Sequence, residues 1–279
     1  MKQSSKLEKI IVKIYQNNPK LRPIIKKIRD IVRPIKPEFS GWGMTSVHIP
    51  PWKNHFDAGI FLDAVRDIKK IKFRLIESTG VDTDNIDDTM WRHWVVSYAT
   101  RHAIKFSQSE KMNFVECGVG EGITAFFTLR QIINDQKSEK KSRMYLYDAW
   151  APMKKEFLLD GELNSEGKYS ELNIEMTKEN LQEFENIITY HEGYIPESFT
   201  KEPENPQSII YLHIDLNSGK PTLEALKFFY PKLEDRGVIL FDDYGALNYS
   251  DTKKMIDEFF KDKNGILFEI PTGQAIYYK

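Results

Sequence analysis

Three aspartates follow two hydrophobic runs of the sequence and could together hold a divalent cation. Asp215 ends the run YLHID, and Asp242 and Asp243 follow the run GVILF. If the two runs are neighbouring strands, their ends bring three mutually repelling carboxylates together, and Mg²⁺ or Ca²⁺ would relieve that repulsion. Such a cation, with Mg²⁺ preferred, could bind neighbouring hydroxyls of a substrate and acidify one of them. Alternatively, Asp243 caps a turn with Gly245 and a single aspartate faces the pocket.

A glycine-rich turn provides a second candidate site. In NFVECGVGEGITAFF, residues 113–127, the glycines at 118, 120 and 122 follow a hydrophobic run that contains Glu116. Glycines allow a tight turn and a close approach by a ligand, and the following helix directs its free N–H groups to the same place. The pattern therefore predicts a nucleotide-type site, with a ligand-free strand-to-helix turn as the alternative.

The spacing of Gly118, Gly120 and Gly122 separates the classes of nucleotide site. A dinucleotide site would have its third glycine at position 123, which is Ile, and a P-loop would continue with Gly-Lys-Ser/Thr. Glu-x-Gly-x-Gly-x-Gly instead resembles the glycine motif of class I S-adenosylmethionine-dependent methyltransferases. This resemblance implies S-adenosylmethionine as cofactor, and Glu116 is expected to face its cationic amino-acid portion.

Two more strand ends are expected to contribute to the cofactor site. The run MYLYD ends in Asp148, about 30 residues after the glycines, where an acid can accept hydrogen bonds from ribose hydroxyls. The run ITYHEG ends in His191, Glu192 and Gly193, which are candidates to line the adenine. The alternatives are a chance surface acid at position 148 and solvated side chains at 191 and 192.

The segment from Asp215 to Gly245 resembles the macrocin and mycinamicin O-methyltransferase family, whose members methylate hydroxyls of sugars on natural products. The family's GYFP motif corresponds to GYIP at 193–196, and its DDY motif to 242–244. Its glycine turn corresponds to 116–124, which implies that Thr124 also binds the cofactor.

One motif departs from the family. Its Asp-Gly-Asp-x-Tyr-x-Ser-Thr pattern appears here as DLNSGKPT at 215–222, with Asn217 in place of the second acid. The resemblance therefore preserves the metal set Asp215, Asp242 and Asp243, but it implies an altered acceptor pocket.

These residues predict a metal-dependent O-methyltransferase acting on a sugar or glycan hydroxyl. Such a hydroxyl is a poor nucleophile, so a metal or a base must assist. Asp215 is the first candidate for the base. His213 is the second, because strand alternation places it on the same face, although a lone strand histidine is more often a core residue. The alternatives are a phenol, catechol or amine acceptor, or a non-catalytic cofactor-binding protein.

The elements that position these residues follow from the periodicity of the chain. We expect strands near 112–117, 144–148, 187–191, 209–215, 237–242, 264–270 and 274–278. Helices are expected between them near 121–134, 175–185, 221–233 and 251–261. This alternation predicts an α/β fold with a doubly wound, Rossmann-like, seven-stranded and mostly parallel sheet. The last two strands are joined by PTG, too short for a crossover, and are expected to form an antiparallel hairpin at the sheet edge.

Three regions are expected along the chain: a basic amphipathic helical extension at 1–37, a helical and irregular cap at 38–108, and the methyltransferase core at 109–279. Long helical patterns lie near 55–78 and 88–106. Within the core, the polar segment 149–173 is expected to close over the site as a lid, with a disordered surface insertion as the alternative.

The cysteine count and the distribution of charge indicate where the protein is expected to be located and what it could bind. Cys117 is the single cysteine of the 279 residues, so no intramolecular disulfide can form, and we expect a cytoplasmic protein without a signal peptide. Residues 1–37 carry eleven Lys or Arg and two acids, a balance of +9, which leaves −10 for the rest of a chain of net charge −1. The extension could contact a membrane peripherally, or pack on its own acidic body or on a second subunit. We expect a homo-oligomer and no nucleic-acid partner.

Overall fold

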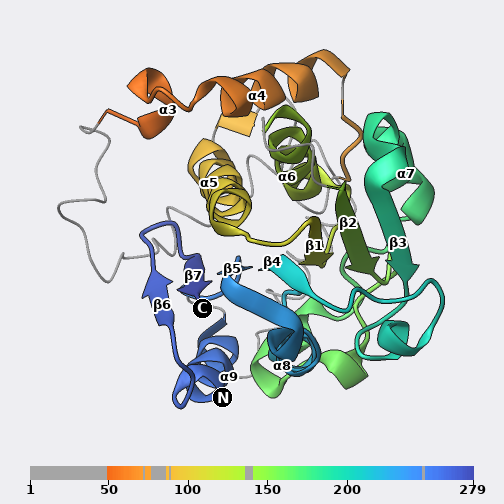
Figure 1. Ribbon diagram of the computed structural model, residues 1–279. Helices are drawn as coiled ribbons and strands as arrows, with labels where there is room; N and C mark the ends of the chain where they lie inside the picture. Colours follow the sequence, from red (N-terminus) through yellow and green to blue (C-terminus); the bar gives the residue numbers. More distant parts are fainter. Residues whose placement is uncertain (1–48, 72, 77–85, 88, 136–140, 247–248) are drawn as a thin grey trace, which may run out of the picture. The chain divides into compact units, whose positions relative to one another are not determined.

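The computed structural model describes residues 49–279, apart from 72, 77–85, 88, 136–140 and 247–248 (Figure 1). The predicted extension at 1–37 lies outside the described residues. Residues 49–279 form one unit whose elements share the sheet described below. In the part of the chain that the structure describes, no helix combines the length and the apolar character that crossing a membrane requires.

A seven-stranded sheet carries the fold, which confirms the predicted α/β class. The strands are β1 (Lys111–Cys117), β2 (Lys141–Asp148), β3 (Ile188–Glu192), β4 (Ile209–Ile214), β5 (Leu233–Phe241), β6 (Ile266–Glu269) and β7 (Ala275–Tyr278). Their order is β3-β2-β1-β4-β5-β7-β6. The first five strands of this order are parallel, and β7 runs antiparallel to both β5 and β6. The hairpin expected at the sheet edge is present.

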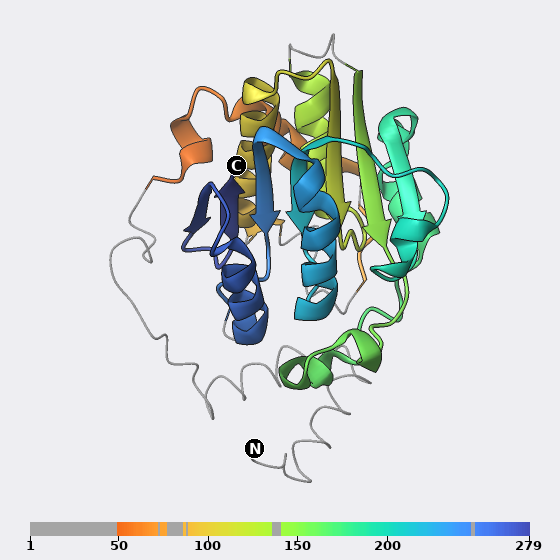
Figure 2. The ribbon, with the colours of Figure 1, turned by 60° about the horizontal axis from the view of Figure 1, so that its bottom comes forward.

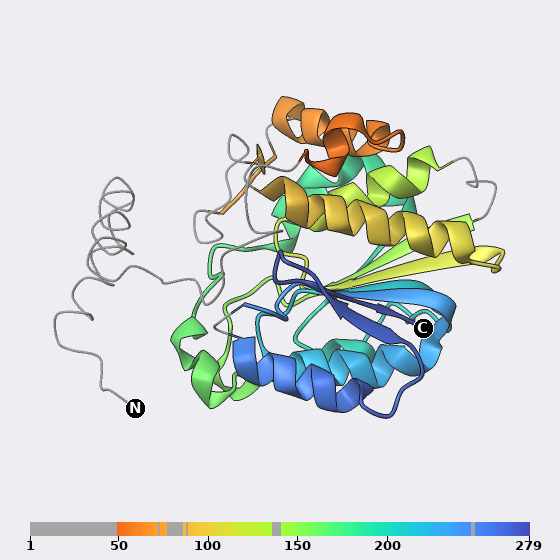
Figure 3. The same cartoon turned by 90° about the vertical axis from the view of Figure 1, so that its left-hand side faces the viewer.

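Helices cover both faces of the sheet (Figure 3). On one face lie α4 (Gly59–Ile71), α5 (Met90–Phe106) and α6 (Ile123–Asn134), and on the other lie α8 (Gly219–Phe229) and α9 (Ser250–Phe260). The short helices α3 (Pro51–Asn54) and α7 (Ile174–Asn180) complete the α-helical elements of the described residues.

Strand alternation divides the core between these two layers. Phe114 and Tyr211 pack in the core on the α4–α6 side, whereas Val115 and Leu212 pack in the core on the α8–α9 side. Because α4 and α5 contribute to the first of these cores, residues of the predicted cap form one layer on the sheet.

The predicted element bounds differ from the structure mainly at helix ends. The helix expected over 175–185 is α7, which ends at Asn180 and is followed by a 3₁₀ turn at Gln182–Ile187. The strand expected from 237 begins earlier, at Leu233, with a register shift against β4 between Ile209 and Tyr211. The carboxyl ends of the parallel strands point toward the side where residues 149–173 lie (Figure 2).

Candidate active site

Hydrogen bonds continue the sheet ladder one residue past the strand ends and align the site residues in a row. The Asp215 N–H donates to the Cys117 carbonyl at 2.9 Å, and the Asp242 N–H donates to the Ile214 carbonyl at 3.0 Å. The residue after β1 is Gly118, so this glycine and the two aspartates lie side by side at one edge of the sheet.

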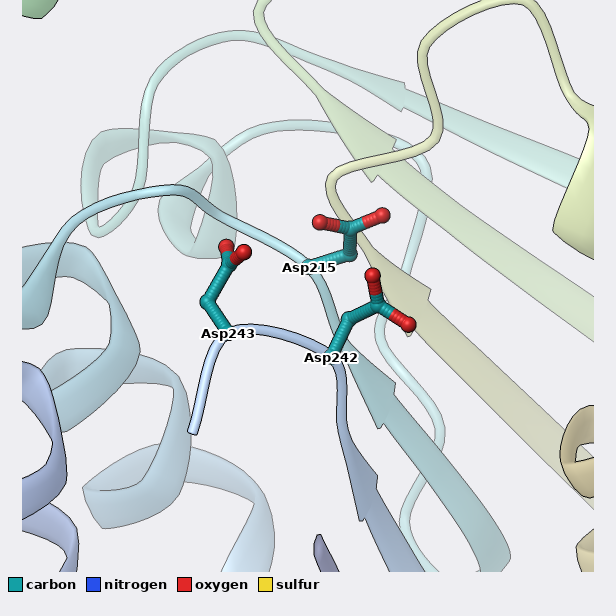
Figure 4. A group of neighbouring side chains, drawn as sticks. All are labelled: Asp215, Asp242 and Asp243. Atoms are coloured by element: carbon teal, nitrogen blue, oxygen red, sulfur yellow. The ribbon is translucent and has the colours of Figure 1, made fainter. Parts of the chain in front are cut away.

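The structure brings the three predicted metal ligands together (Figure 4). One carboxylate oxygen from each of Asp215, Asp242 and Asp243 lies within 4.8 Å of the others. Two ligands on opposite sides of a Mg²⁺ ion are roughly 4.2 Å apart, since each Mg²⁺–oxygen distance is about 2.1 Å. The donor set therefore suits a divalent cation, but only one pair of the three oxygens could lie on opposite sides of it, and neighbouring oxygens would have to approach to about 3.0 Å.

Arg92, which sequence reasoning missed, lies against this acidic cluster of Asp215, Asp242 and Asp243. It projects from α5, and its Nη2 lies 2.6 Å from Asp215 Oδ2 and 2.8 Å from Asp242 Oδ2. Strand alternation explains the contact, because Asp215 and Asp242 follow β4 and β5 on the face that α5 covers. The only sequence signal was an arginine at the start of an otherwise apolar and aromatic stretch of helix, MWRHW.

Burial and the crowding of charges shift the pKa values of the three aspartates in different directions. Burial, reinforced by the charge of Asp242, raises the pKa of Asp215 to about 7. Burial and the charge of Asp215 also raise the pKa of Asp243 well above its usual value. For Asp242, the opposing charges of Arg92 and His213 outweigh burial and hold its pKa well below the usual range. Asp215 and Asp243 therefore hold protons more readily than ordinary aspartates, whereas Asp242 holds a proton less readily.

His213 and Glu116 lie beneath the cavity and do not line it, so their expected roles as base and as cofactor contact stay predictions. Both side chains are completely buried. His213 Nδ1 lies 3.7 Å from Glu116 Oε1 and His213 Nε2 lies 3.9 Å from Asp242 Oδ1. Although burial lowers the pKa of His213, these two carboxylates raise it to about 10. Both residues lie just before the ends of their strands and point into the layer of α5 and α6, so the His213 ring lies between two carboxylates.

The glycine turn has the backbone that the sequence predicted. Gly118, Gly120 and Gly122 all have positive φ, at 83°, 55° and 94°. A Cβ at Gly118 would lie 2.0 Å from the carbonyl oxygen of Asp215, so only glycine lets β1 and β4 end this close together. A Cβ at Gly120 would meet nothing within 4 Å, which leaves open space above the turn for a ligand.

Asp148 supports this turn directly. Its Oδ2 accepts hydrogen bonds from the N–H groups of Val119 at 2.7 Å and Gly120 at 2.9 Å. Its Oδ1 accepts one from the Trp150 N–H at 2.7 Å. Burial raises the pKa of Asp148, and these backbone donors oppose that rise. The expected ribose acceptor is thus also the residue that shapes the turn.

A cavity of about 440 Å³ joins the turn to the acidic cluster. Of the predicted cofactor residues, the following line it: Gly118, Gly120, Thr124, Asp148 and Gly193. Gly122 caps α6 beside the cavity. Glu192 is exposed and borders a neighbouring surface depression instead, because it is the last residue of β3 and points away from the cavity.

Residues 149–173 form one wall of the cavity. Met153, Phe157 and Tyr169 line it. Glu162 holds the segment in place, because its carboxylate accepts hydrogen bonds from the Ser218 hydroxyl at 2.6 Å and from the Gly219 N–H at the start of α8 at 3.0 Å. The segment is therefore ordered against α8, while its opening and closing as a lid stays a prediction.

The sequence profile of the macrocin O-methyltransferase (TylF) family matches residues 79–278, well over half of the chain. The chain belongs to the macrocin O-methyltransferase family. The resemblance inferred from the motifs is confirmed, and the protein is an S-adenosylmethionine-dependent methyltransferase. No curated protein sequence matches the chain significantly.

Two solved structures have a similar fold. The structure of the O-methyltransferase NovP is 15% identical with a TM-score of 0.58, over 68% of this chain and 80% of that chain. The structure of CalS11, a calicheamicin methyltransferase, is 13% identical with a TM-score of 0.54, over 87% of this chain and 98% of that chain. At sequence identities this low, the structural comparison shows a shared fold and no more.

Asn217 marks where this macrocin O-methyltransferase family member departs from the family motif. Its φ of 54° lies in the left-handed region, which asparagine tolerates better than most residues. The Asn217 N–H donates to Asp243 Oδ2 at 2.8 Å. Its side-chain oxygen accepts hydrogen bonds from the hydroxyls of Tyr249 at 2.6 Å and Tyr169 at 3.2 Å. The neutral amide joins the acidic cluster to the cavity wall without adding a fourth negative charge.

Proposed function

We propose that this protein transfers the methyl group of S-adenosylmethionine to a hydroxyl of a sugar or glycan, and that Mg²⁺ assists at Asp215, Asp242 and Asp243. The observation that carries the proposal is the single cavity that contains both the glycine turn and the three carboxylates. A methyl donor bound at the turn would therefore lie beside a group that can activate a hydroxyl.

The cofactor end of the cavity would use the glycine turn and the residues around it. Gly120 leaves room for the ligand, and Asp148 holds the turn in shape through the N–H groups of Val119 and Gly120. Thr124 and Gly193 complete the wall at the start of α6 and after β3. Glu116 would act indirectly, by accepting a hydrogen bond from the Thr124 hydroxyl.

The acceptor end would use the acidic cluster. A divalent cation, when bound there, would supply a Lewis acid that lowers the pKa of a coordinated hydroxyl. Asp215 lines the cavity, and its pKa near 7 suits a proton acceptor at neutral pH. His213 is not accessible to an acceptor, so it would act by orienting Asp242 rather than by taking the proton.

The family supports a sugar acceptor. The resemblance implies methylation of sugar hydroxyls on natural products, and the similar fold of NovP, an O-methyltransferase, is consistent with an oxygen acceptor. Two neighbouring hydroxyls of a sugar would provide two oxygen ligands for a metal, a geometry that simple amines lack.

The test is methyl transfer from labelled S-adenosylmethionine to sugar acceptors that carry or lack a vicinal diol. We expect turnover only with the diol, only with added Mg²⁺, and not in the Asp243→Ala variant. Asp160→Ala, in the 3₁₀ helix Asp160–Ser165, is the control for loss of a nearby acid. Turnover that survives chelation would remove the metal from the proposal. Transfer to catechols or amines in preference to sugars would change the acceptor class.

Other predictions about this protein's surroundings stay open to experiment. A cytoplasmic location, a homo-oligomer and peripheral membrane contact through residues 1–37 are part of the same proposal. Failure of the full-length protein to co-sediment with anionic vesicles at low salt, where electrostatic binding is strongest, would remove the membrane contact.

A further inference from the structure

The acidic cluster already has a cation of its own. A single nitrogen of Arg92, Nη2, bridges Oδ2 of Asp215 at 2.6 Å and Oδ2 of Asp242 at 2.8 Å. The side chains of these three residues are 30%, 16% and 12% exposed, so the contact is largely shielded from water. Ion pairs in such surroundings are screened much less than surface pairs.

The remaining oxygens of the two aspartates also have donors. Asp242 Oδ1 accepts a hydrogen bond from Gln274 Nε2 at 2.8 Å, and Asp215 Oδ1 has Asn217 Nδ2 at 3.4 Å. Each carboxylate is therefore held by a cation on one side and by a neutral amide on the other. This arrangement offsets much of the cost of burying neighbouring negative charges.

We infer that Arg92 is the resident counter-cation of the acidic cluster, and that a divalent metal ion must compete with its guanidinium for the oxygens of Asp215 and Asp242. The second half of this inference rests on the proposed metal-dependent function. An ion bound to the same oxygens would place a second positive charge beside the guanidinium, and like charges at this distance repel. Arg92 thus keeps the site assembled before a metal arrives and lowers the affinity for that metal.

The first half is tested without metal, by urea unfolding in EDTA of four proteins: wild type, Arg92→Met, Asp242→Asn and the double variant. Removal of Arg92 alone leaves Asp215 and Asp242 without the guanidinium that bridges them, so we expect a loss of stability that is clearly smaller in the Asp242→Asn background. Additive effects of the two substitutions would overturn the counter-cation role. If Arg92→Met does not fold, recovery of folding in the double variant supports the inference, and failure of both overturns it.

Arg101→Met is the matched control for this cycle. Arg101 lies on the same helix and also pairs with an aspartate, Asp57, but away from the acidic cluster. Its effect should add to that of Asp242→Asn without coupling. Coupling as large as that of Arg92 would mean that any positive charge on α5 is sufficient, and would overturn the specific role of Arg92.

The second half is tested by calorimetric titration of Mg²⁺ into protein saturated with S-adenosylhomocysteine. We expect Arg92→Met to bind Mg²⁺ more tightly than wild type, by a factor within the roughly 5- to 150-fold typical of coupled sites, and Arg101→Met to match wild type. Equal or weaker binding in Arg92→Met would overturn the competition. Absence of binding in every protein would overturn the competition together with the metal-dependent mechanism, while the cycle in EDTA still decides whether Arg92 is the counter-cation.

Discussion

The two halves of the sheet edge stabilise their buried acids in different ways. At the end of β2, Asp148 is held by three backbone N–H groups, all neutral donors. After β4 and β5, Asp215 and Asp242 share the positive charge of Arg92. The backbone donors oppose the rise that burial causes in the pKa of Asp148, and its oxygens can still accept hydrogen bonds from hydroxyls. In the crowded acidic half, on the proposed mechanism, a metal ion would have to compete with the guanidinium of Arg92.

The buried histidines of the two halves show the same contrast. His191 in β3 stacks on Tyr147 with ring centroids 4.1 Å apart, and burial lowers its pKa to about 4. His213 in β4 lies between Glu116 and Asp242, and these carboxylates raise its pKa to about 10 despite burial. Burial disfavours a charged imidazole in both places, so the neighbouring acids decide the sign.

The largest expected effect concerns the acidic half. Asp215→Asn removes a candidate metal ligand and proton acceptor, so we expect kcat to fall about 10²- to 10⁴-fold. The KM for S-adenosylmethionine should change little, since the cofactor half is untouched. Steady-state kinetics with a sugar acceptor measure both parameters. A large rise in the cofactor KM with kcat intact would show that the two halves are not separate.

The next largest effect is expected at Gly118, where the cofactor half and the acidic half of the sheet edge meet. Gly118→Ala would place a methyl group 2.0 Å from the Asp215 carbonyl oxygen at a φ of 83°, so we expect a loss of at least about 3 kcal/mol in the free energy of unfolding.

Gly120→Ala is the control, because its φ is also positive but its Cβ would meet no atom within 4 Å. The conformational cost alone is about 1–2 kcal/mol. Urea denaturation of both variants gives the comparison. Equal losses would mean that the close approach of Gly118 to Asp215 is not needed.

The two buried histidines should make the free energy of unfolding fall on opposite sides of its pH profile, His213 on the alkaline limb and His191 on the acidic limb. The pKa of His213 is higher in the folded than in the unfolded protein, so its contribution is full below about pH 6.5 and is lost as pH rises toward 10. The pKa of His191 is lower in the folded protein, so its contribution is full above about pH 6.5 and is lost as pH falls toward 4. Each limb has a slope of at most about 1.4 kcal/mol per pH unit.

Two substitutions assign these limbs. His213→Gln should flatten the alkaline limb, and His191→Phe, which keeps an aromatic ring against Tyr147, should flatten the acidic limb. Free energies of unfolding across the pH range provide the measurement. An alkaline limb that persists in His213→Gln would show that His213 is neutral in the folded protein.

The smallest effect is expected in the cofactor half. Asp148→Asn keeps the shape of the side chain but weakens its hydrogen bonds to the turn, so we expect the KM for S-adenosylmethionine to rise about tenfold, equivalent to about 1.4 kcal/mol, with kcat nearly unchanged. A loss of kcat as large as that of Asp215→Asn would contradict the division between the two halves.

Much of the site could be predicted because it lies at strand ends. Hydrophobic periodicity indicates where each strand stops, and parallel strands stop at one edge, so Gly118, Asp148, Asp215 and Asp242 were expected to lie there together. The directions of side chains just before those ends were harder to predict. Glu116 and His213 lie on the sheet face covered by α5 and α6. No local sequence pattern indicates whether the cofactor cavity reaches side chains on that face.

The sequence by itself determined the α/β fold and the row of acids and glycines, because each follows from a local pattern of apolar spacing and turn residues. Its motifs also carried the resemblance to the family that the profile match confirms. Only the tertiary structure decided which charges meet. Arg92 reaches Asp215 and Asp242 because α5 packs over β4 and β5, a contact between segments more than a hundred residues apart. The same packing buries His213 between two carboxylates and raises its pKa, which its neighbours in sequence do not predict.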